Sequence, residues 1–370
     1  MPRPGDCWEW QTDARWEATA SRFRGRLSNA SLLRAGYDAD TESVGAGHAP
    51  PTPGHRCRGH RRVARPARRS RLGQGADGAP QAPYFYRFKV GNAECTVASD
   101  GPLPLGDPDK SFLKISHDEI QKELSENFLP TTDAVLEQNA LLVNFGDRLV
   151  LFDSGMGNDK LFGNTTGKLL TSLQQAGIKP EQVDAVVMSH AHIDHCGGLM
   201  SASGERNFPN AQYFIGEPDF AYWTSDSKIP PNYPARQHFL DQAQKNLLPN
   251  KDRIHFYKDH EEILPGVTAL SAPGHTVSHT IFMISSGNQQ LCYIGDLAHH
   301  QVLLLEHPRT QFAYDTDPAQ SAESRVRMLD MLAANRIPLV AYHFPWPGIG
   351  HVTKRGEGFV YYPQPMILAQ

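Results

Sequence analysis

The chain has 370 residues, 39% of them hydrophobic, which allows two or three domains and a sizeable buried core. Its formal net charge is only −4, so no basic footprint of the kind that nucleic-acid binders need extends over the whole chain. No apolar run is long enough to span a membrane. We therefore expect neither a membrane-spanning protein nor a general nucleic-acid binder.

Residues 1–83 differ in composition from the rest of the chain. They contain 14 Arg and no Lys against 8 acidic residues, whereas residues 84–370 carry 22 basic and 32 acidic residues. Arginines separated by Gly, Pro and Ala cannot bury enough apolar surface to fold alone. The segment is either a basic arm for nucleic acid or a membrane surface, or a disordered or wrongly translated leader, and the absence of lysine favours the leader. We expect the folded domain to span residues 84–370.

The location of the protein is predicted from the same leader and from the cysteines. The leader contains no apolar segment of the length that a signal peptide requires. The five cysteines show no paired spacing and do not require an oxidising compartment. The written sequence therefore predicts a cytoplasmic location, and a periplasmic or secreted location stays open if the true start of the protein lies elsewhere.

Short, β-branched apolar runs predict most of the secondary structure after residue 84. Hairpins followed by strand–helix units, twice over, indicate two sheets packed together and covered by helices. Residues 102–133 lack a strand pattern, and we expect them to wrap the domain or cover the mouth of a site. The predicted strands are 86–90, 94–98, 141–145, 148–152, 183–188, 213–215, 254–256, 268–271, 280–284, 291–294 and 339–342, and the predicted helices are 167–175, 236–246 and 321–334.

The segment from Ser189 to Gly198 concentrates side chains that bind metals. His190, His192, Asp194 and His195 fall within six positions, directly after the apolar run 183–188. On a strand, residues i and i+2 point the same way, so the first two histidines can converge on one ion. We expect Gly197 and Gly198 to give a flexible exit into a helix. Neutral imidazoles with a carboxylate suit zinc and related divalent metals.

Three later apolar runs are each followed at once by another candidate ligand. His275, Asp296 and His343 come after the runs 268–272, 291–294 and 338–342. Loops at one edge of a sheet commonly build a site together. The sequence therefore predicts one metal centre built from seven side chains.

The ordered set of these residues resembles the metallo-β-lactamase-fold hydrolases. The H-x-H-x-D-H motif of that family matches residues 190–195, and its later His, bridging Asp and final His match His275, Asp296 and His343. The resemblance covers residues 84 to the C-terminus. Within the superfamily the chain is most similar to methyl parathion hydrolase and the quorum-quenching lactonases, through residues 274–276, 295–297, 343–351 and 356–359. It implies an α/β fold, a four-layer αββα sandwich with the metals at the edge shared by both halves.

The resemblance also implies roles for the seven residues. Two divalent ions are expected, zinc first, with manganese, cobalt or iron as alternatives, and a hydroxide bridging them would attack an ester, lactone or phosphotriester of a hydrophobic small molecule. Asp194 would in addition carry a proton to the leaving group. The first ion would be bound by His190, His192 and His275, and the second by Asp194, His195 and His343, with Asp296 bridging the two.

Several nearby residues have two interpretations each. Asp153, the family's early Asp at a strand end, orients a ligand histidine or forms a turn. Trp223 is a wall of the substrate pocket, where Tyr233 and Phe239 are also expected, or it belongs to an ordinary helix core. His299 stands where lactonases of this fold often carry a tyrosine that polarises the lactone carbonyl, and a histidine could donate a similar hydrogen bond. We expect Cys196 to be a small buried residue.

Other functions on the same fold are weaker alternatives. A phosphodiesterase or nuclease would need a basic surface, which a body of net charge −10 lacks. A hydrolytic dehalogenase stays chemically feasible. A redox relative commonly replaces a ligand histidine by a carboxylate, and a non-catalytic protein would have lost ligands, whereas here none is missing. The expected partner is a small-molecule substrate, with no nucleic acid or membrane, and the chain is compatible with a homodimer.

Overall fold

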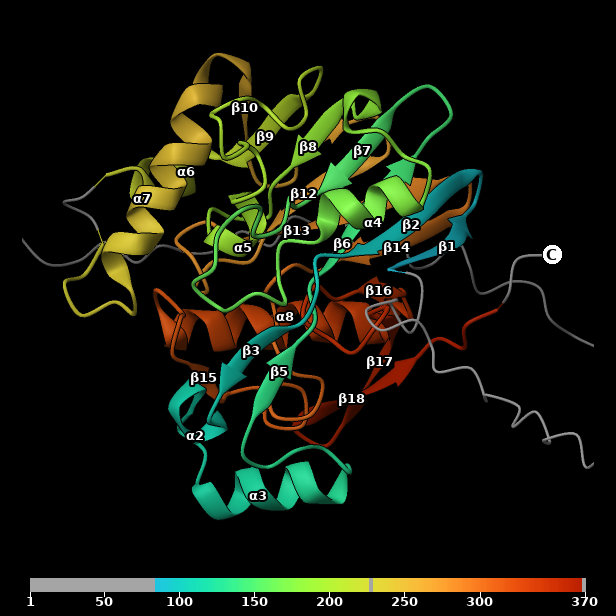
Figure 1. Cartoon of the computed structure of the whole chain (residues 1–370). Helices are drawn as coiled ribbons and strands as arrows, with labels where there is room; N and C mark the ends of the chain where they lie inside the picture. Colours follow the sequence, from blue (N-terminus) through green and yellow to red (C-terminus); the bar gives the residue numbers. More distant parts are fainter. Residues whose placement is uncertain (1–83, 226–228, 368–370) are drawn as a thin grey trace, which may run out of the picture. The chain divides into compact units, whose positions relative to one another are not determined.

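The computed structural model describes residues 84–225 and 229–367, drawn in colour in Figure 1. The arginine-rich segment 1–83 lies outside the described residues, so both interpretations of it, and the domain boundary, stay predictions. Among the described residues no helix has the length and hydrophobicity needed to cross a bilayer.

Two seven-stranded sheets form the body of the fold (Figure 1). Their strand orders are β1-β2-β6-β7-β8-β9-β10 and β11-β12-β13-β14-β16-β17-β18. The first sheet contains β1 (Phe85–Val90), β2 (Ala93–Ser99), β6 (Asn139–Asn144), β7 (Leu149–Phe152), β8 (Ala185–Val187), β9 (Gln212–Gly216) and β10 (Ile254–Tyr257). The second contains β11 (Glu262–Leu264), β12 (Val267–Ser271), β13 (Thr280–Ser286), β14 (Gln289–Tyr293), β16 (Leu339–Val340), β17 (Ile349–Arg355) and β18 (Gly358–Pro363).

The two sheets pack face to face, and strand β13 shows how. Successive side chains of a strand point to opposite faces. Phe282 and Ile284 enter the core shared with the first sheet, and the Phe282 ring lies 5.5 Å from that of Phe152 on β7. Ile281 joins the other core, on the opposite face of the second sheet. Both faces of β13 are covered, which explains why its sequence is hydrophobic at successive positions from Ile281 to Ile284.

Helices cover the outer faces. Leu169 and Leu173 of α4 (Leu169–Gln175) pack on β1 and β2 of the first sheet, whereas α7 (Arg236–Leu247) packs mainly on the short helices beside it. Met328 and Leu332 of α8 (Pro318–Asn335) pack on the second. The fold is therefore the mixed α/β sandwich, helix–sheet–sheet–helix, that the sequence predicts. The remaining helices are α2 (Pro108–Ser111), α3 (His117–Glu126), α5 (Ile193–Cys196) and α6 (Glu217–Trp223), with 3-10 turns at Pro180–Gln182 and Leu248–Arg253.

The prediction that residues 102–133 contain no strands is wrong. This segment holds β3 (Leu103–Gly106) and β4 (Phe112–Leu113), which pair with β5 (Ala134–Leu136) and β15 (Gln311–Phe312) in two small separate sheets. These strands are too short to show an alternating pattern. The segment does reach the site, as expected, because Leu103 and Leu105 line the cavity described below.

Candidate metal centre

The chain crosses from strand to loop at one edge of each sheet, and the predicted site residues lie in these loops. The loops come from both sheets, so residues far apart in sequence meet at one place. Asp153 follows β7, the segment 189–195 follows β8, His275 follows β12, Asp296 follows β14 and His343 follows β16.

The motif segment reaches the site by a route that differs from the prediction. Strand β8 already ends at Val187, so His190 and His192 stand in an extended turn, although their rings are 4.6 Å apart. The turn of α5 then carries Asp194 and His195. Gly197 and Gly198 follow the turn of α5 and lead into a loop before β9, so the expected exit into a helix is wrong. A Cβ on Gly198 would lie 1.9 Å from the Ser154 carbonyl oxygen, so glycine is required for close backbone packing.

All seven predicted ligands come together, in two groups that share one carboxylate. Within each group the candidate ligand atoms lie within 4.8 Å of one another, and either group could hold a metal ion. Among the described residues, the buried Nε2 atoms of His190, His195 and His275 have no hydrogen-bond partner. Buried polar atoms are normally paired, so these orphaned nitrogens fit a cation. The groups are His190, His192, His275 and Asp296, and Asp194, His195, His343 and Asp296.

Carboxylates orient two of the five imidazoles. Asp153 Oδ2 lies 2.8 Å from His195 Nδ1, and Asp315 Oδ1 lies 2.8 Å from His275 Nδ1. A carboxylate can only accept, so each Nδ1 carries the proton and each Nε2 keeps its lone pair. Asp153 also accepts from the Tyr293 hydroxyl and adopts a positive φ of 61°, a conformation that costs energy for a non-glycine residue.

Neutral acceptors fix the other three imidazoles. His343 Nδ1 donates to the Glu137 carbonyl at 2.8 Å. His190 Nδ1 lies 2.9 Å from Ser189 Oγ, whose own proton goes to Asp153.

His192 is held the other way round. Its Nε2 lies 3.0 Å from the hydroxyl of Tyr233, and that hydroxyl donates to the Tyr314 carbonyl. The Nε2 of His192 is therefore the donor, and its Nδ1 lone pair is left for a metal. In its neutral form, each of the five imidazoles thus presents one unprotonated nitrogen to the site, the arrangement that metal-binding histidines need.

The charges in the centre are strongly coupled. Burial opposes ionisation of Asp296, yet His195 and His343 outweigh it and hold the pKa of this carboxyl well below its usual range. Burial likewise lowers the pKa of His343, but Asp296 and Asp194 outweigh it and raise this pKa to about 9. Burial lowers the pKa of His190 and His192, helped by their imidazole neighbours. In the metal-free protein, some imidazoles therefore hold protons where cations would sit.

Two further histidines surround Asp296 without joining either group. His279 donates from Nδ1 to the Ala272 carbonyl and accepts the Asp296 backbone N–H at 3.0 Å. Its pKa is lowered to about 3, mainly by burial, so it is neutral and positions the Asp296 backbone. His299 Nε2 lies 3.0 Å from Asp296 Oδ2, and the ring stacks on Phe312 with centroids 3.8 Å apart.

Trp223 and Cys196 are core residues in the structure. Trp223 is fully buried, meets the His192 ring edge-on at 4.6 Å and is not among the residues that line the cavity, so it packs behind a candidate ligand. Cys196 is also fully buried, and burial raises the pKa of its thiol, which favours the neutral thiol expected of a small buried residue.

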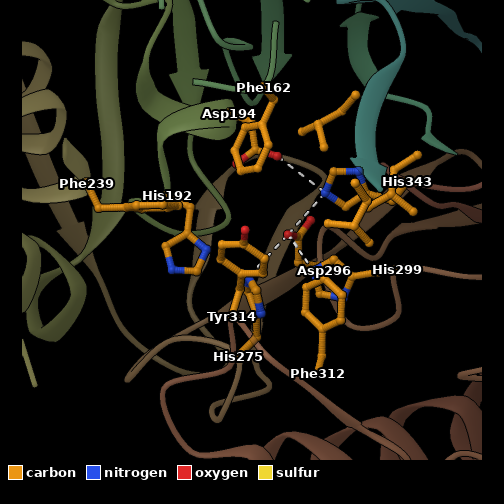
Figure 2. Close-up of a pocket in the computed structure, with 13 residues that line it drawn as sticks. Phe162, His192, Asp194, Phe239, His275, Asp296, His299, Phe312, Tyr314 and His343 are labelled. Atoms are coloured by element: carbon orange, nitrogen blue, oxygen red, sulfur yellow. Dashed lines mark hydrogen bonds and ion pairs between the residues drawn. The ribbon is translucent and has the colours of Figure 1, made fainter. Parts of the chain in front are cut away.

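A cavity opens onto the two groups (Figure 2). Its lining combines the metal-binding candidates with hydrophobic and aromatic side chains, and none of the described lining residues is Lys or Arg. Most of these walls come from segments without periodicity, so the sequence carries no signal for them, and only Phe239 was expected. The walls are Leu103, Leu105, Leu136, Phe162, Phe239, Phe312 and Tyr314.

Comparison with known proteins agrees with this geometry. The family model of the metallo-beta-lactamase superfamily matches residues 134–341, which include all seven candidate ligands except His343. The chain belongs to the metallo-beta-lactamase superfamily. Among curated proteins of known activity, an N-acyl homoserine lactonase of Bacillus cereus is 23% identical over 240 residues, covering 62% of this chain and 82% of that protein.

Two solved structures share this superfamily fold over most of the chain. AidC, a dizinc quorum-quenching lactonase in complex with a product, is 30% identical, with a TM-score of 0.72 and coverage of 77% of this chain and 98% of AidC. The hydrolase AbOPH is 27% identical, with a TM-score of 0.72 and coverage of 77% and 99%. The protein is a metal-dependent hydrolase of this superfamily, with groups of His and Asp that can bind metal.

Proposed function

We propose that the protein is a dinuclear hydrolase. One cation would be held by His190, His192 and His275, the other by Asp194, His195 and His343, and Asp296 would bridge them. The observation that carries this proposal is the shared pattern of the five imidazoles. In each ring one nitrogen is hydrogen-bonded to a fixed acceptor. The other nitrogen is left for the group of candidate ligands to which that histidine belongs.

A pair of divalent cations in this position would lower the pKa of bound water and polarise a carbonyl or phosphoryl oxygen. The protein supplies the surroundings for that chemistry. Asp194 Oδ2 lies 3.4 Å from His195 Nε2 and 3.3 Å from His343 Nε2, and its side chain also lines the cavity. It can therefore take a proton from water and return it to a leaving oxygen. Zinc suits the imidazole and carboxylate donors best.

The cavity walls favour an uncharged substrate with a hydrophobic group. Leu, Phe and Tyr side chains line it, and no described lining residue is a cation that would neutralise a phosphodiester. The lactonase relatives make a lactone or carboxylic ester the first substrate class to test, with a phosphotriester second. The cavity does not support the nuclease alternative, because its described lining residues offer no lysine or arginine for a phosphodiester.

The test uses zinc-free protein reloaded with zinc, manganese or cobalt. We expect about two metal ions per chain by elemental analysis, and turnover of N-hexanoyl homoserine lactone, p-nitrophenyl hexanoate or methyl parathion. Bis-p-nitrophenyl phosphate should be hydrolysed poorly. Turnover that survives complete chelation would contradict the proposal.

A variant of the shared carboxylate separates metal binding from folding. Asp296→Ala should lose both ions and activity, because it removes a ligand from each group. Asp330→Ala, which breaks an exposed ion pair with Lys354, is the matched control and should keep both. Two ions in the Asp296→Ala protein would contradict the bridging role.

A further inference from the structure

Tyr314 contributes the one hydroxyl group among the described residues that line the cavity. The other polar groups of the lining are imidazoles and carboxylates of the metal centre or, in His299, a ring whose Nε2 lies against Asp296. No hydrogen bond from the Tyr314 hydroxyl to any described residue is found. The cavity thus contains a neutral O–H donor that has no structural task.

The backbone of Tyr314 is fixed to the metal centre on both sides. Its carbonyl accepts the Tyr233 hydroxyl at 2.7 Å, and the same hydroxyl holds His192. The next residue, Asp315, holds His275 at 2.8 Å. The position of Tyr314 relative to two candidate ligands is therefore set by short hydrogen bonds and not by loop contacts alone.

Packing then directs the side chain. The ring lies between Phe162, Phe239 and Phe312, with centroid distances of 6.0, 6.2 and 5.7 Å. Figure 2 shows its hydroxyl pointing into the space between His192, Asp194 and Asp296. Burial, and then the Asp194 charge, raises the pKa of this phenol, so it stays protonated at neutral pH.

We propose that Tyr314 is a catalytic residue that donates a hydrogen bond to the substrate oxygen on which negative charge builds up. The proposal rests on the proposed hydrolase function. During ester hydrolysis the water oxygen bonds to the carbonyl carbon, and the former carbonyl oxygen becomes an oxyanion that accepts the Tyr314 O–H. The bond to the leaving oxygen then breaks as the carbonyl re-forms. The proton lost by water reaches the leaving oxygen through Asp194, and Tyr314 keeps its own proton.

The direct test compares Tyr314→Phe, which removes only the hydroxyl, with wild type. The control is Tyr222→Phe, on α6 outside the cavity lining. In zinc-loaded full-length protein we expect Tyr314→Phe to lower kcat about 100- to 1000-fold, as loss of one oxyanion donor does. KM should change little, and zinc content and thermal midpoint should match the control. An unchanged kcat would overturn the proposal.

The choice of substrate shows which oxygen is contacted. p-Nitrophenyl hexanoate has a good leaving group and ethyl hexanoate a poor one. A donor to the non-leaving oxygen should cost both substrates a similar factor in Tyr314→Phe. A loss confined to the ethyl ester would place the hydroxyl on the leaving oxygen and overturn the assignment.

A binding measurement keeps this proposal separate from the proposed function. Hexylphosphonate carries anionic oxygens on a tetrahedral centre. Calorimetry should show that it binds Tyr314→Phe about tenfold more weakly than wild type, or weaker still. Equal binding by both proteins would overturn the role of Tyr314. A different outcome is that wild type binds the phosphonate more tightly than Tyr314→Phe does but hydrolyses none of the substrates. That result would contradict the proposed hydrolase function and leave the Tyr314 hydrogen bond standing.

Discussion

At the residue scale, the metal centre depends on what lies behind each ligand. Its imidazoles are paired with Asp153, Asp315, a serine, a tyrosine and a backbone carbonyl. Such partners fix the tautomer and the ring orientation before a cation arrives. The sequence motif reveals the ligands, because their spacing is regular. Among these partners it pointed only to Asp153, which follows a strand; Asp315 lies 40 residues after His275, with no pattern linking them.

The partner of His275 can be tested by itself. Asp315→Asn keeps the shape of the side chain but removes its charge. Because the His275 tautomer is then less firmly held, we expect the affinity for the first zinc to fall about 10- to 100-fold. Competition with a chromophoric chelator measures this. Asp317→Asn, two residues away at the N-cap of α8, is the control and should keep wild-type affinity.

Metal affinity should rise with pH. The pKa of His275 is raised to about 8 and that of His343 to about 9, in both cases because nearby carboxylates outweigh burial. At pH 7 the metal-free protein therefore holds protons that a cation must displace. We expect apparent zinc affinity to increase from pH 6 through pH 9, with protons released on binding. A zinc titration that gives the same affinity at all these pH values would contradict the protonation of the empty site.

At the element scale, α8 fixes the loops that carry the site. Its Arg325 is fully buried and donates to the carbonyls of Leu297, Pro308 and Thr310. Its guanidinium also lies 3.9 Å from Asp315, the residue that orients His275. One side chain thus ties the loop after β14 to the helix and to the metal centre.

Removing this side chain should destabilise the fold. Arg325→Met leaves three buried carbonyls without their donor, so we expect the free energy of unfolding to fall by about 3–5 kcal/mol. Urea denaturation of the zinc-free protein measures it. Arg327→Met, which removes an exposed bond to the Ser271 carbonyl, should cost at most about 1 kcal/mol. If both variants lost the same free energy of unfolding, the buried hydrogen bonds of Arg325 would contribute no more to stability than an exposed one.

Elements with a clear pattern were predictable from the sequence. Strands such as β6 and β13 and the helix α8 show continuous or periodic hydrophobicity, and their predicted positions agree with the structure within a few residues. The hairpin of β17 and β18 was missed because its outer half is exposed and polar. The amphipathic helix α3 was missed as well, although Ser116 caps it by accepting the Glu119 N–H.

At the scale of the whole molecule, the body of the chain is acidic and the arginines gather before residue 84. We expect a protein lacking residues 1–80 to keep its folding and turnover, because the two sheets and all seven candidate ligands lie beyond them. Thermal unfolding and kcat/KM with p-nitrophenyl hexanoate compare the two forms. Insolubility or inactivity of the shortened protein would show that the leader belongs to the domain.

The ligands are divided between the sheets: four belong to the loop after β8, and three to loops of the opposite sheet. A bound cation would therefore join the two halves of the sandwich directly, in addition to the core packing and to hydrogen bonds such as that from the Tyr293 hydroxyl to Asp153. The same ions would then support both folding stability and catalysis. The thermal midpoint of unfolding should therefore rise with the concentration of free zinc. A cell short of the bound metal would then lose this protein by unfolding as well as by inactivity.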